Sequence, residues 1–391
     1  MVSWPGVSFA RAACWPPEAA RAPGWRRAAA GCLLVAVLLP SACGRRGAPE
    51  KKLIAFGWDE PDTAFLREHI GRMETLPFEG CVFSALVRPA DGGEVNLAWR
   101  FWSRERFPPE AFEAARRDLW RTPRGRFRHD FLHLNVTPGD VDWFESFSPI
   151  LSNARLAARL AREGGCAGIL LDTEPYQAPL FDYNQRCRAA GRDWNTCAAQ
   201  ARQRGRELMH AFEQGFPGLT LFVTLGYELP WMELQNGRRS LAECPRGLLA
   251  PFLDGLVAGA RQARLVDGFE PSYGYRDPRL FADARRTVLE GLLPIVGDRE
   301  RHRAFVTVGF GIWLDYDWRR QGWHPQDPSR NYFTPEALER SLCAAFQAAD
   351  EYVWLYTETP RRWTRDGPPR DLPPVYLEAI RRARRCAGLT D

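Results

Sequence analysis

Short apolar runs alternate with amphipathic stretches along most of this chain. The apolar runs are Leu53–Trp58, Gly80–Val87, Phe131–Val136, Gly168–Leu171, Leu219–Leu225, Leu265–Phe269, Phe305–Trp313 and Tyr352–Tyr356. Each is close to continuously apolar, as expected of a strand that is buried on both faces. The pattern therefore predicts a series of buried strands.

The stretches between these runs have the apolar spacing of helices. The clearest are Asp62–Leu76, Ser152–Glu163, Cys197–Gln214, Asp277–Leu293, Thr334–Asp350 and a last helix at Tyr376–Arg385. Several begin with a capping residue, namely Asp62, Ser152, Asp277 and Thr334 followed by Pro335. Strands and helices in strict alternation indicate parallel strands joined by right-handed crossovers.

The number of units favours one closed barrel over an open sheet. Eight units in about 340 residues are typical of a single (β/α)8 (TIM) barrel, an α/β fold, here spanning residues 52–391. An open doubly wound sheet would need a glycine-rich loop after its first strand, and residues 57–61, Gly-Trp-Asp-Glu-Pro, do not supply one. The connections after strands 2, 4 and 5 are long, at Arg88–Asp130, Tyr176–Asn195 and Gly226–Gly247. Long connections on a compact domain are usually functional.

The N-terminal region has the pattern of an export signal. Arg26 and Arg27 precede the apolar run Ala28–Leu39, and small residues follow it before Cys43. The run is shorter than the roughly 20 residues that a membrane-spanning helix needs. Ser41-Ala42-Cys43 resembles the lipobox of bacterial lipoproteins, although Pro40 occupies the usual aliphatic position.

This resemblance implies that residues 1–42 are a signal peptide, that Cys43 is lipidated and that residues 43–51 are a linker. We therefore expect an exported lipoprotein of the cell envelope or outer membrane, held to the membrane by its lipid alone. A periplasmic or secreted protein is the alternative. Loss of residues 1–42 removes four arginines and one glutamate from 53 basic and 48 acidic residues, so the net charge falls from +5 to +2. No basic stripe indicates a nucleic-acid partner, and we expect a monomer.

The cysteines do not form a recognisable metal or redox motif. Seven of the ten lie beyond Cys43, and no two have CxxC spacing. In an oxidising compartment Cys187 and Cys197 could close a loop of about ten residues. Free or buried thiols are the alternative.

Acidic and aromatic residues collect where the predicted strands end, which is where barrel enzymes place their chemistry. Aromatic faces stack on sugar rings and carboxylates accept hydrogen bonds from hydroxyls, so these positions predict a carbohydrate site. The expected substrate contacts are Trp58, Asp59, Asn135, Tyr176, Tyr227, Tyr273, Tyr275, Trp313, Trp354 and Tyr356. The catalytic candidates are Glu174, Asp172, Glu270 and Glu358.

Asp172 and Glu174 form the sharpest pair. Residues i and i+2 of a strand point to the same side, roughly 6.5–7 Å apart, so both would face the barrel mouth while Thr173 faces the helices. Like charges so close raise one pKa and keep a proton available for a leaving group. The alternative is a carboxylate pair that forms a salt bridge with a neighbouring arginine.

Asp-x-Glu at the end of strand four of an exported barrel resembles the catalytic end of family-eighteen chitinases and related hexosaminidases. The resemblance implies that Glu174 protonates the glycosidic oxygen and that Asp172 orients an acetamido group. It also implies assistance from Tyr273 or Tyr275 and from Trp354. The run Gly168–Leu171 lacks the aspartate of the fuller chitinase pattern. The resemblance is therefore to glycoside-hydrolase-like barrels in general.

Glu270 and Glu358 are the candidates if a second carboxylate acts as nucleophile. Retaining glycosidases place their two carboxyls about 5–5.5 Å apart and inverting ones about 6.5–9.5 Å apart. The sequence does not distinguish these cases.

Other chemistries find less support. The mature chain has no HxH or HExxH motif, so we expect no metal or other cofactor, and we interpret His133 as a hydrogen-bonded core residue. Ser84 and Ser272 lack a nucleophile elbow. Three functions remain open: a glycosidase acting on a polysaccharide or glycan, a non-catalytic carbohydrate-binding lipoprotein with a degenerate barrel, and a different barrel enzyme such as a metal-dependent hydrolase or a lyase.

Overall fold

The computed structural model describes residues 50–389 apart from 90–91, 318–321 and 364–371. The chain divides into one unit of residues 1–50 and a second of residues 51–391. The predicted signal at 1–42, its Cys43 and the linker up to residue 49 lie outside the described residues. Within the described part, no helix is long and apolar enough to cross a bilayer.

A ring of parallel strands forms the centre of the second unit. Its strands are β1 (Lys52–Gly57), β2 (Gly80–Phe83), β5 (Phe131–Asn135), β6 (Gly168–Asp172), β7 (Thr220–Val223), β8 (Arg264–Asp267), β9 (Val306–Val308), β10 (Phe310–Trp313) and β11 (Tyr352–Thr357). The order is β10-β11-β1-β2-β5-β6-β7-β8-β9, with every pairing parallel.

The ring is nearly closed. β9 and β10 are separated by Gly309 alone; β9 pairs with β8 and β10 pairs with β11. The two segments therefore occupy one strand position, the predicted run Phe305–Trp313, and the nine segments make the eight positions of a TIM-type barrel. This confirms the fold class.

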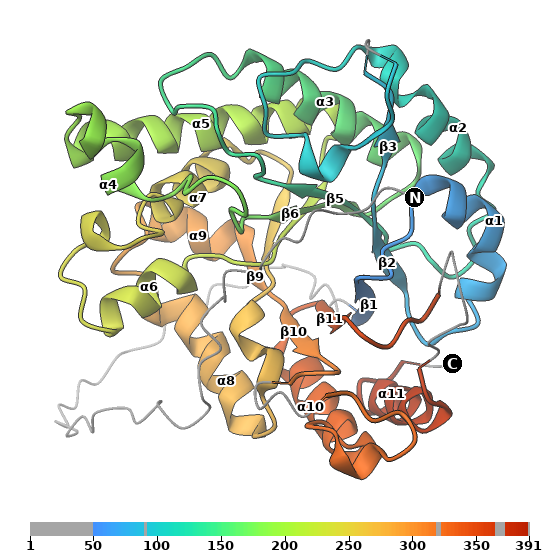
Figure 1. The fold of residues 1–391 in the computed structure, drawn as a ribbon. Helices are drawn as coiled ribbons and strands as arrows, with labels where there is room; N and C mark the ends of the chain where they lie inside the picture. The colour runs from blue at the N-terminus through green and yellow to red at the C-terminus, as the bar shows by residue number, and fades with distance from the viewer. Residues whose placement is uncertain (1–49, 90–91, 318–321, 364–371, 390–391) are drawn as a thin grey trace, which may run out of the picture. The chain divides into compact units, whose positions relative to one another are not determined.

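Helices cover the outside of the ring (Figure 1). They are α1 (Thr63–Met73), α2 (Glu113–Arg121), α3 (Ser148–Glu163), α5 (Trp194–Gly215), α7 (Leu249–Gly259), α8 (Pro278–Arg286), α9 (Arg299–Phe305), α10 (Pro335–Ala348) and α11 (Pro374–Cys386). Asp62, Asp277 and Thr334 cap α1, α8 and α10 as predicted. Ser152 does not cap a helix, because α3 begins at Ser148.

Two apolar cores follow from the alternation of side chains along the strands. The inner core fills the ring with Ile54, Val82, Phe131, Leu170, Phe222, Val266, Tyr352 and Trp354. The outer core lies between strands and helices and takes the alternate strand residues, such as Leu171 and Leu265. Consequently the residues two positions beyond an inner-core residue also point into the ring, at its C-terminal end.

The long connections contain short elements of their own. The one after β2 holds a hairpin of β3 (Leu86–Val87) and β4 (Val95–Asn96), the 3-10 turns η1 (Leu97–Trp99) and η2 (Pro109–Phe112), and helix α2. The one after β6 holds α4 (Tyr183–Arg186) and the 3-10 turn η3 (Arg188–Ala190). The one after β7 holds α6 (Glu228–Gln235) and η4 (Leu241–Glu243).

Two disulfides are present. Cys187–Cys197 joins α4 to α5, one of the two alternatives left open by the sequence, and Cys343–Cys386 joins α10 to α11, which was not predicted. Cys81, Cys166 and Cys244 are buried free thiols.

Candidate functional site

We call the C-terminal ends of the barrel strands, with the residues that follow each, the barrel mouth. Asp172 is the last residue of β6 and stands two positions after the inner-core residue Leu170, so its side chain points into the ring. Asn135 ends β5 and is in register with Asp172. The register of two neighbouring strands thus brings these polar side chains together.

Four hydrogen-bond donors surround the buried Asp172 carboxyl. Oδ2 accepts from Asn135 Nδ2 at 2.7 Å and from the Tyr176 hydroxyl at 3.4 Å. Oδ1 accepts from the Glu174 backbone N–H at 2.9 Å and from the Thr224 hydroxyl at 3.3 Å. Burial raises the pKa of Asp172, while nearby His133 and these hydrogen bonds lower it; the net shift is upward. The carboxyl is therefore held in one orientation by neutral groups.

Glu174 follows Asp172 by two positions and is half-buried. Burial raises the pKa of its carboxyl, the neighbouring Asp172 raises it further, and Tyr176 and Arg246 only partly oppose this. Arg246 is itself bound to Glu233 through a 3.4 Å ion pair. Glu174 therefore tends to keep a proton, which is what a general acid requires.

Glu270 brings a third carboxyl to the mouth from β8, two strand positions along the ring from β6. It begins the 3-10 turn η5 (Glu270–Gly274) after β8, and its backbone N–H donates to Thr224 O at 3.2 Å. Burial raises the pKa of Glu270 well above its usual range, and the charges of Glu174 and Asp172 raise it further. Among the described residues, neither Glu174 nor Glu270 forms an ion pair. The three carboxyls therefore form one electrostatically linked group.

Aromatic rings form one wall of the mouth. Tyr273 stacks on Tyr356 with ring centroids 5.4 Å apart and an interplanar angle of 18°, and Trp313 packs edge-on against both. The Tyr356 hydroxyl accepts a 2.9 Å hydrogen bond from Trp58 Nε1, and Trp58 is 52% exposed. These four rings provide flat apolar faces beside the acidic group.

Glu358 lies at the end of this wall, after β11. Its carboxyl accepts a 3.3 Å hydrogen bond from the Tyr356 hydroxyl. Burial and the charge of Asp315 raise the pKa of Glu358 to about 7. Asp315 accepts the backbone N–H groups of Glu358 and Thr359, at 3.0 and 2.8 Å, and so ties the ends of β10 and β11 together.

Other predicted contacts lie away from this group. Asp59 is ion-paired with Arg362 at 2.8 Å, and both side chains are only 1% exposed. Tyr227 is buried among the outer helices and donates to Asp254 of α7 at 3.0 Å. Tyr275 packs against Phe281 of α8. Such contacts depend on tertiary packing that strand position alone does not reveal.

Trp354 is also less accessible than the resemblance implied. It belongs to the inner core and is 1% exposed, and its indole N–H donates to Gly268 O at 2.8 Å. Its contact with the mouth is through Tyr273, whose ring lies 5.1 Å from it.

Sequence reasoning missed three groups that contact the site. His133 is the buried, hydrogen-bonded residue that the sequence predicted, 3% exposed and 3.1 Å from the Glu60 carboxyl through Nδ1, but its place beside the site was not predicted; its Nε2 is buried without a hydrogen-bond partner among the described residues. Trp99 packs edge-on against His133 and Tyr176, with centroids 6.1 and 5.3 Å away. Thr224 bonds Asp172 directly. The available signal was position: His133 and Thr224 each stand two residues after an inner-core residue.

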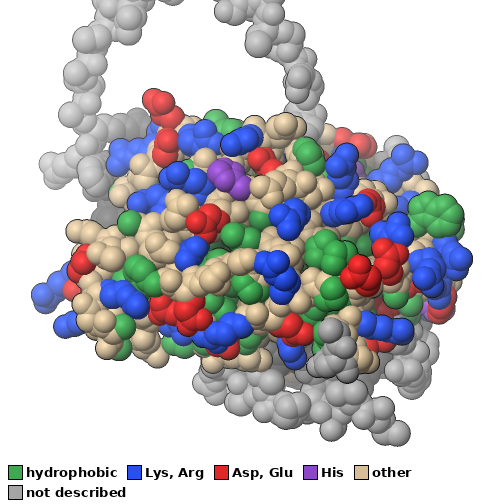
Figure 2. All heavy atoms as spheres, turned by 90° about the horizontal axis from the view of Figure 1, so that it is seen from above, with side chains coloured by type: hydrophobic (Ala, Val, Ile, Leu, Met, Phe, Trp, Pro, Cys, Tyr) green, Lys and Arg blue, Asp and Glu red, His purple; other side chains and the backbone are tan. Residues whose placement is uncertain are grey.

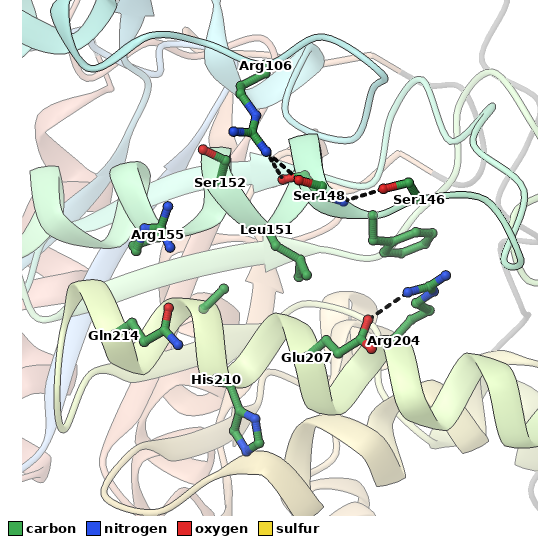
Figure 3. Close-up of a pocket in the computed structure, with 12 residues that line it drawn as sticks. Arg106, Ser146, Ser148, Leu151, Ser152, Arg155, Arg204, Glu207, His210 and Gln214 are labelled. Atoms are coloured by element: carbon green, nitrogen blue, oxygen red, sulfur yellow. Dashed lines mark hydrogen bonds and ion pairs between the residues drawn. The ribbon is translucent and has the colours of Figure 1, made fainter.

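The outer surface carries a separate groove of about 530 Å³ between α3 and α5 (Figure 3). Arg106, Arg155, Arg204 and His210 line it. Arg204 is bound to Glu207, and Arg106 to Ser148. The side chains on this side of the molecule mix basic and acidic groups (Figure 2). The groove lies on the outer helices, and none of the three mouth carboxyls, Asp172, Glu174 and Glu270, lines it.

In the part of the chain that the structure describes, no group of three or more His, Cys, Asp and Glu side chains is placed to hold a metal ion. Compared with known proteins, the chain matches no protein-family model and no curated protein sequence. The geometry of the mouth is therefore the basis for any functional conclusion.

Proposed function

We propose that this protein is a glycosidase-like hydrolase that acts on a polysaccharide or glycan at the barrel mouth. The observation that carries the proposal is the meeting of Asp172, Glu174 and Glu270 beside the wall of Tyr273, Tyr356 and Trp313. Glycoside hydrolysis needs one protonated and one ionised carboxyl across a sugar ring, and stacked aromatics suit the apolar faces of that ring.

Glu174 is the proposed general acid. It is half-buried and its pKa is raised by burial and by Asp172, so it can give its proton to the glycosidic oxygen as the bond to the anomeric carbon breaks. Asp172, held by four donors, orients Glu174 and the substrate. Glu270 is the proposed second carboxylate, because its pKa responds to both Asp172 and Glu174. It accepts the proton of the attacking water, or attacks the carbon first and is then displaced by water. Both roles need ionised Glu270, and a proton on Glu174 favours that form, because the charge of Glu174 is one of the groups that raise the pKa of Glu270.

Glu358 is less well placed for that role. The groups that perturb its pKa are Asp315, Tyr356 and Arg361, and neither Asp172 nor Glu174 is among them. We assign Glu358 and Trp58 to substrate binding at the end of the aromatic wall.

A non-catalytic sugar-binding barrel would have its acids neutralised by arginines. Here Asp59 is neutralised by Arg362, but Arg246 is bound to Glu233, and neither Glu174 nor Glu270 forms an ion pair among the described residues. That arrangement supports catalysis over binding alone.

The test is a screen of aryl-glycosides and polysaccharides with the wild type, Glu174→Gln and a control, Glu110→Gln. Glu174→Gln keeps the size of the side chain and removes the proton. We expect at least a 100-fold loss of kcat for Glu174→Gln and no change for the exposed Glu110→Gln. Equal activity of wild type and Glu174→Gln contradicts the assignment of the acid. Sugar binding without turnover in the wild type favours the binding lipoprotein.

We also propose that the protein is exported and lipidated at Cys43. The two disulfides support export, because disulfides are typical of oxidising compartments. Metabolic labelling with a palmitate analogue should tag the wild type and leave Cys43→Ala unlabelled. A labelled Cys43→Ala variant would contradict the assignment, and an unlabelled wild type recovered outside the cytoplasm would indicate simple secretion.

A further inference from the structure

Asp267 and Glu228 form a buried carboxyl pair just outside the strand ring, beside the mouth. Asp267 ends β8 one position after the inner-core residue Val266, so its side chain points outward. Glu228 is the first residue of α6. A Cβ atom placed on Gly226 would lie 2.6 Å from Asp267 Oδ2 and 2.8 Å from Glu228 Oε2. The two carboxyls therefore meet at Gly226, and Glu228 Oε2 is buried there without a hydrogen-bond partner among the described residues.

No described cation is paired with either carboxyl, and the side chains of Asp267 and Glu228 are almost completely buried at 1% and 0% exposure. The titratable and charged groups around them are Glu270 of η5, Tyr275 just after η5, Tyr227 just before Glu228, Asp254 of α7 with its partner Arg202 of α5, and His302 of α9. Two ionised carboxylates this close would repel each other strongly in a buried space that holds no paired cation. The pair therefore holds at least one proton.

The pair fixes the two turns that supply residues to the mouth. Glu228 Oε1 accepts the Gly226 N–H at 2.7 Å, and Asp267 Oδ1 accepts the Phe269 N–H at 3.1 Å. Phe269 has φ = +42° and is the one non-glycine residue of the described chain in the left-handed region. Such a conformation costs roughly 1–3 kcal/mol and persists only where the surroundings impose it. Glu270 is the next residue after Phe269, so the direction of its side chain depends on this turn.

We propose that Asp267 and Glu228 are positioning residues whose shared proton holds the Phe269 turn and thereby fixes Glu270 in the same acidic group as Asp172. Loss of that proton places two like charges together in a buried space, drives the β7 and β8 turns apart and displaces Glu270. The consequence for catalysis rests on the proposed function, whereas the consequence for the turn does not.

The direction of the pH effect follows from the protons bound. Burial raises the pKa of Asp267 to about 7, and burial together with Asp267 raises that of Glu228 well above its usual range. An unfolded chain releases both protons near pH 4. The folded state therefore holds more protons, and stability present at pH 4 is lost as the pH rises through 7 and beyond.

The first measurement is the melting temperature between pH 5 and 9 for wild type, Glu228→Gln and Asp267→Asn. Each variant keeps an amide that can replace the shared proton as donor. We expect both to melt at least about 3 °C above wild type at pH 8.5 and to lose less stability between pH 5 and 9. Asp254→Asn is the matched control, a buried acid that has its own arginine partner, and should not raise the melting temperature at pH 8.5. Parallel curves for wild type and both variants would overturn the proposal.

The second measurement reports on the turn itself. The Trp354 indole N–H donates to Gly268 O, between Asp267 and Phe269. In protein labelled with ¹⁵N-tryptophan, we expect this indole resonance to move as the pH rises from 6 to 9 in wild type and to stay in place in Glu228→Gln. No movement in wild type would overturn the positioning role, whatever the enzyme assays show.

Activity separates the two proposals. Where turnover is found, kcat of wild type should fall at alkaline pH together with the Trp354 shift, and Glu228→Gln should extend activity upward with KM little changed. If both proteins turn over substrate and Glu228→Gln has the same pH profile of kcat as wild type, the positioning role is refuted and the hydrolase proposal is not. A titrating Trp354 signal without any turnover supports the shared proton and refutes the hydrolase.

Discussion

Asn135 Nδ2 lies 2.7 Å from Asp172 Oδ2, across the ends of two strands that are in register. The other side-chain atom of Asn135, Oδ1, accepts the backbone N–H of Thr137 at 2.7 Å. Asn135 is therefore clamped from behind while it orients the carboxyl in front. Asn135 therefore links the backbone after β5 to the orientation of the Asp172 carboxyl.

Replacing Asn135 with Ala should impair catalysis more than folding. Asp172 loses a hydrogen bond to an ionisable group, worth about 1.5–3 kcal/mol, so we expect kcat/KM to fall about 10- to 100-fold. The matched control is Asn153→Ala. Asn153 is an equally buried asparagine of α3 that accepts the Phe107 N–H at 3.0 Å and donates to Glu105 O at 2.8 Å, away from the mouth. The Asn153→Ala variant should be less stable than wild type and have the same kcat/KM. Similar activity losses in both variants would mean that Asn135 acts through the fold alone.

The strands could be predicted because a strand covered on both faces is apolar at nearly every position. Helix α7 could not, since ten of its eleven residues are buried and it has no polar face to give a helical period. The same limit applies to the site. Alternation along β6 predicts that Asp172 and Glu174 point to the same side, but Thr224, which donates to Asp172, and Glu270 come from other segments. Tyr227 follows β7 yet faces the helices, because it lies at the start of α6.

The Asp59–Arg362 ion pair predicts that Asp59 stabilises the fold and does not contact substrate. Asp59 was expected to contact substrate, but its carboxyl forms an ion pair with the Arg362 guanidinium, and each of the two side chains is only 1% exposed. Asp59→Asn should leave Arg362 as a buried unpaired charge and cost about 3–5 kcal/mol of unfolding free energy in urea. The double variant Asp59→Asn with Arg362→Met should recover part of that loss. A large rise in KM with unchanged stability would instead return Asp59 to the substrate contacts.

Glu358 should impose its own pH dependence on stability. Its folded pKa of about 7 lies above the unfolded value near 4.3, so the folded protein keeps a proton that the unfolded chain releases. Stability should therefore fall as the pH rises from about 4.5 to 7 and level off above that. Glu358→Gln removes this contribution and should melt higher than wild type at pH 7.5 but not at pH 4.5. The exposed Glu300→Gln serves as control in the same thermal scans, and a Glu358→Gln curve that tracks wild type throughout would show that the carboxyl is solvated.

The two disulfides should differ in what they contribute to stability. Cys343–Cys386 closes a separation of 43 residues and Cys187–Cys197 one of 10. If the chief effect is to restrict the unfolded chain, loop-closure entropy assigns them about 4 and about 2.7 kcal/mol respectively. The double serine variant at 343 and 386 should therefore unfold at lower urea concentration than the double variant at 187 and 197. In reducing buffer the wild-type chain loses both disulfides, so it should unfold at a lower urea concentration than either double variant does in non-reducing buffer. The reverse order would mean that Cys187–Cys197 acts on the folded state, by holding the connection after β6 that carries Tyr176 and Glu174 beside the mouth.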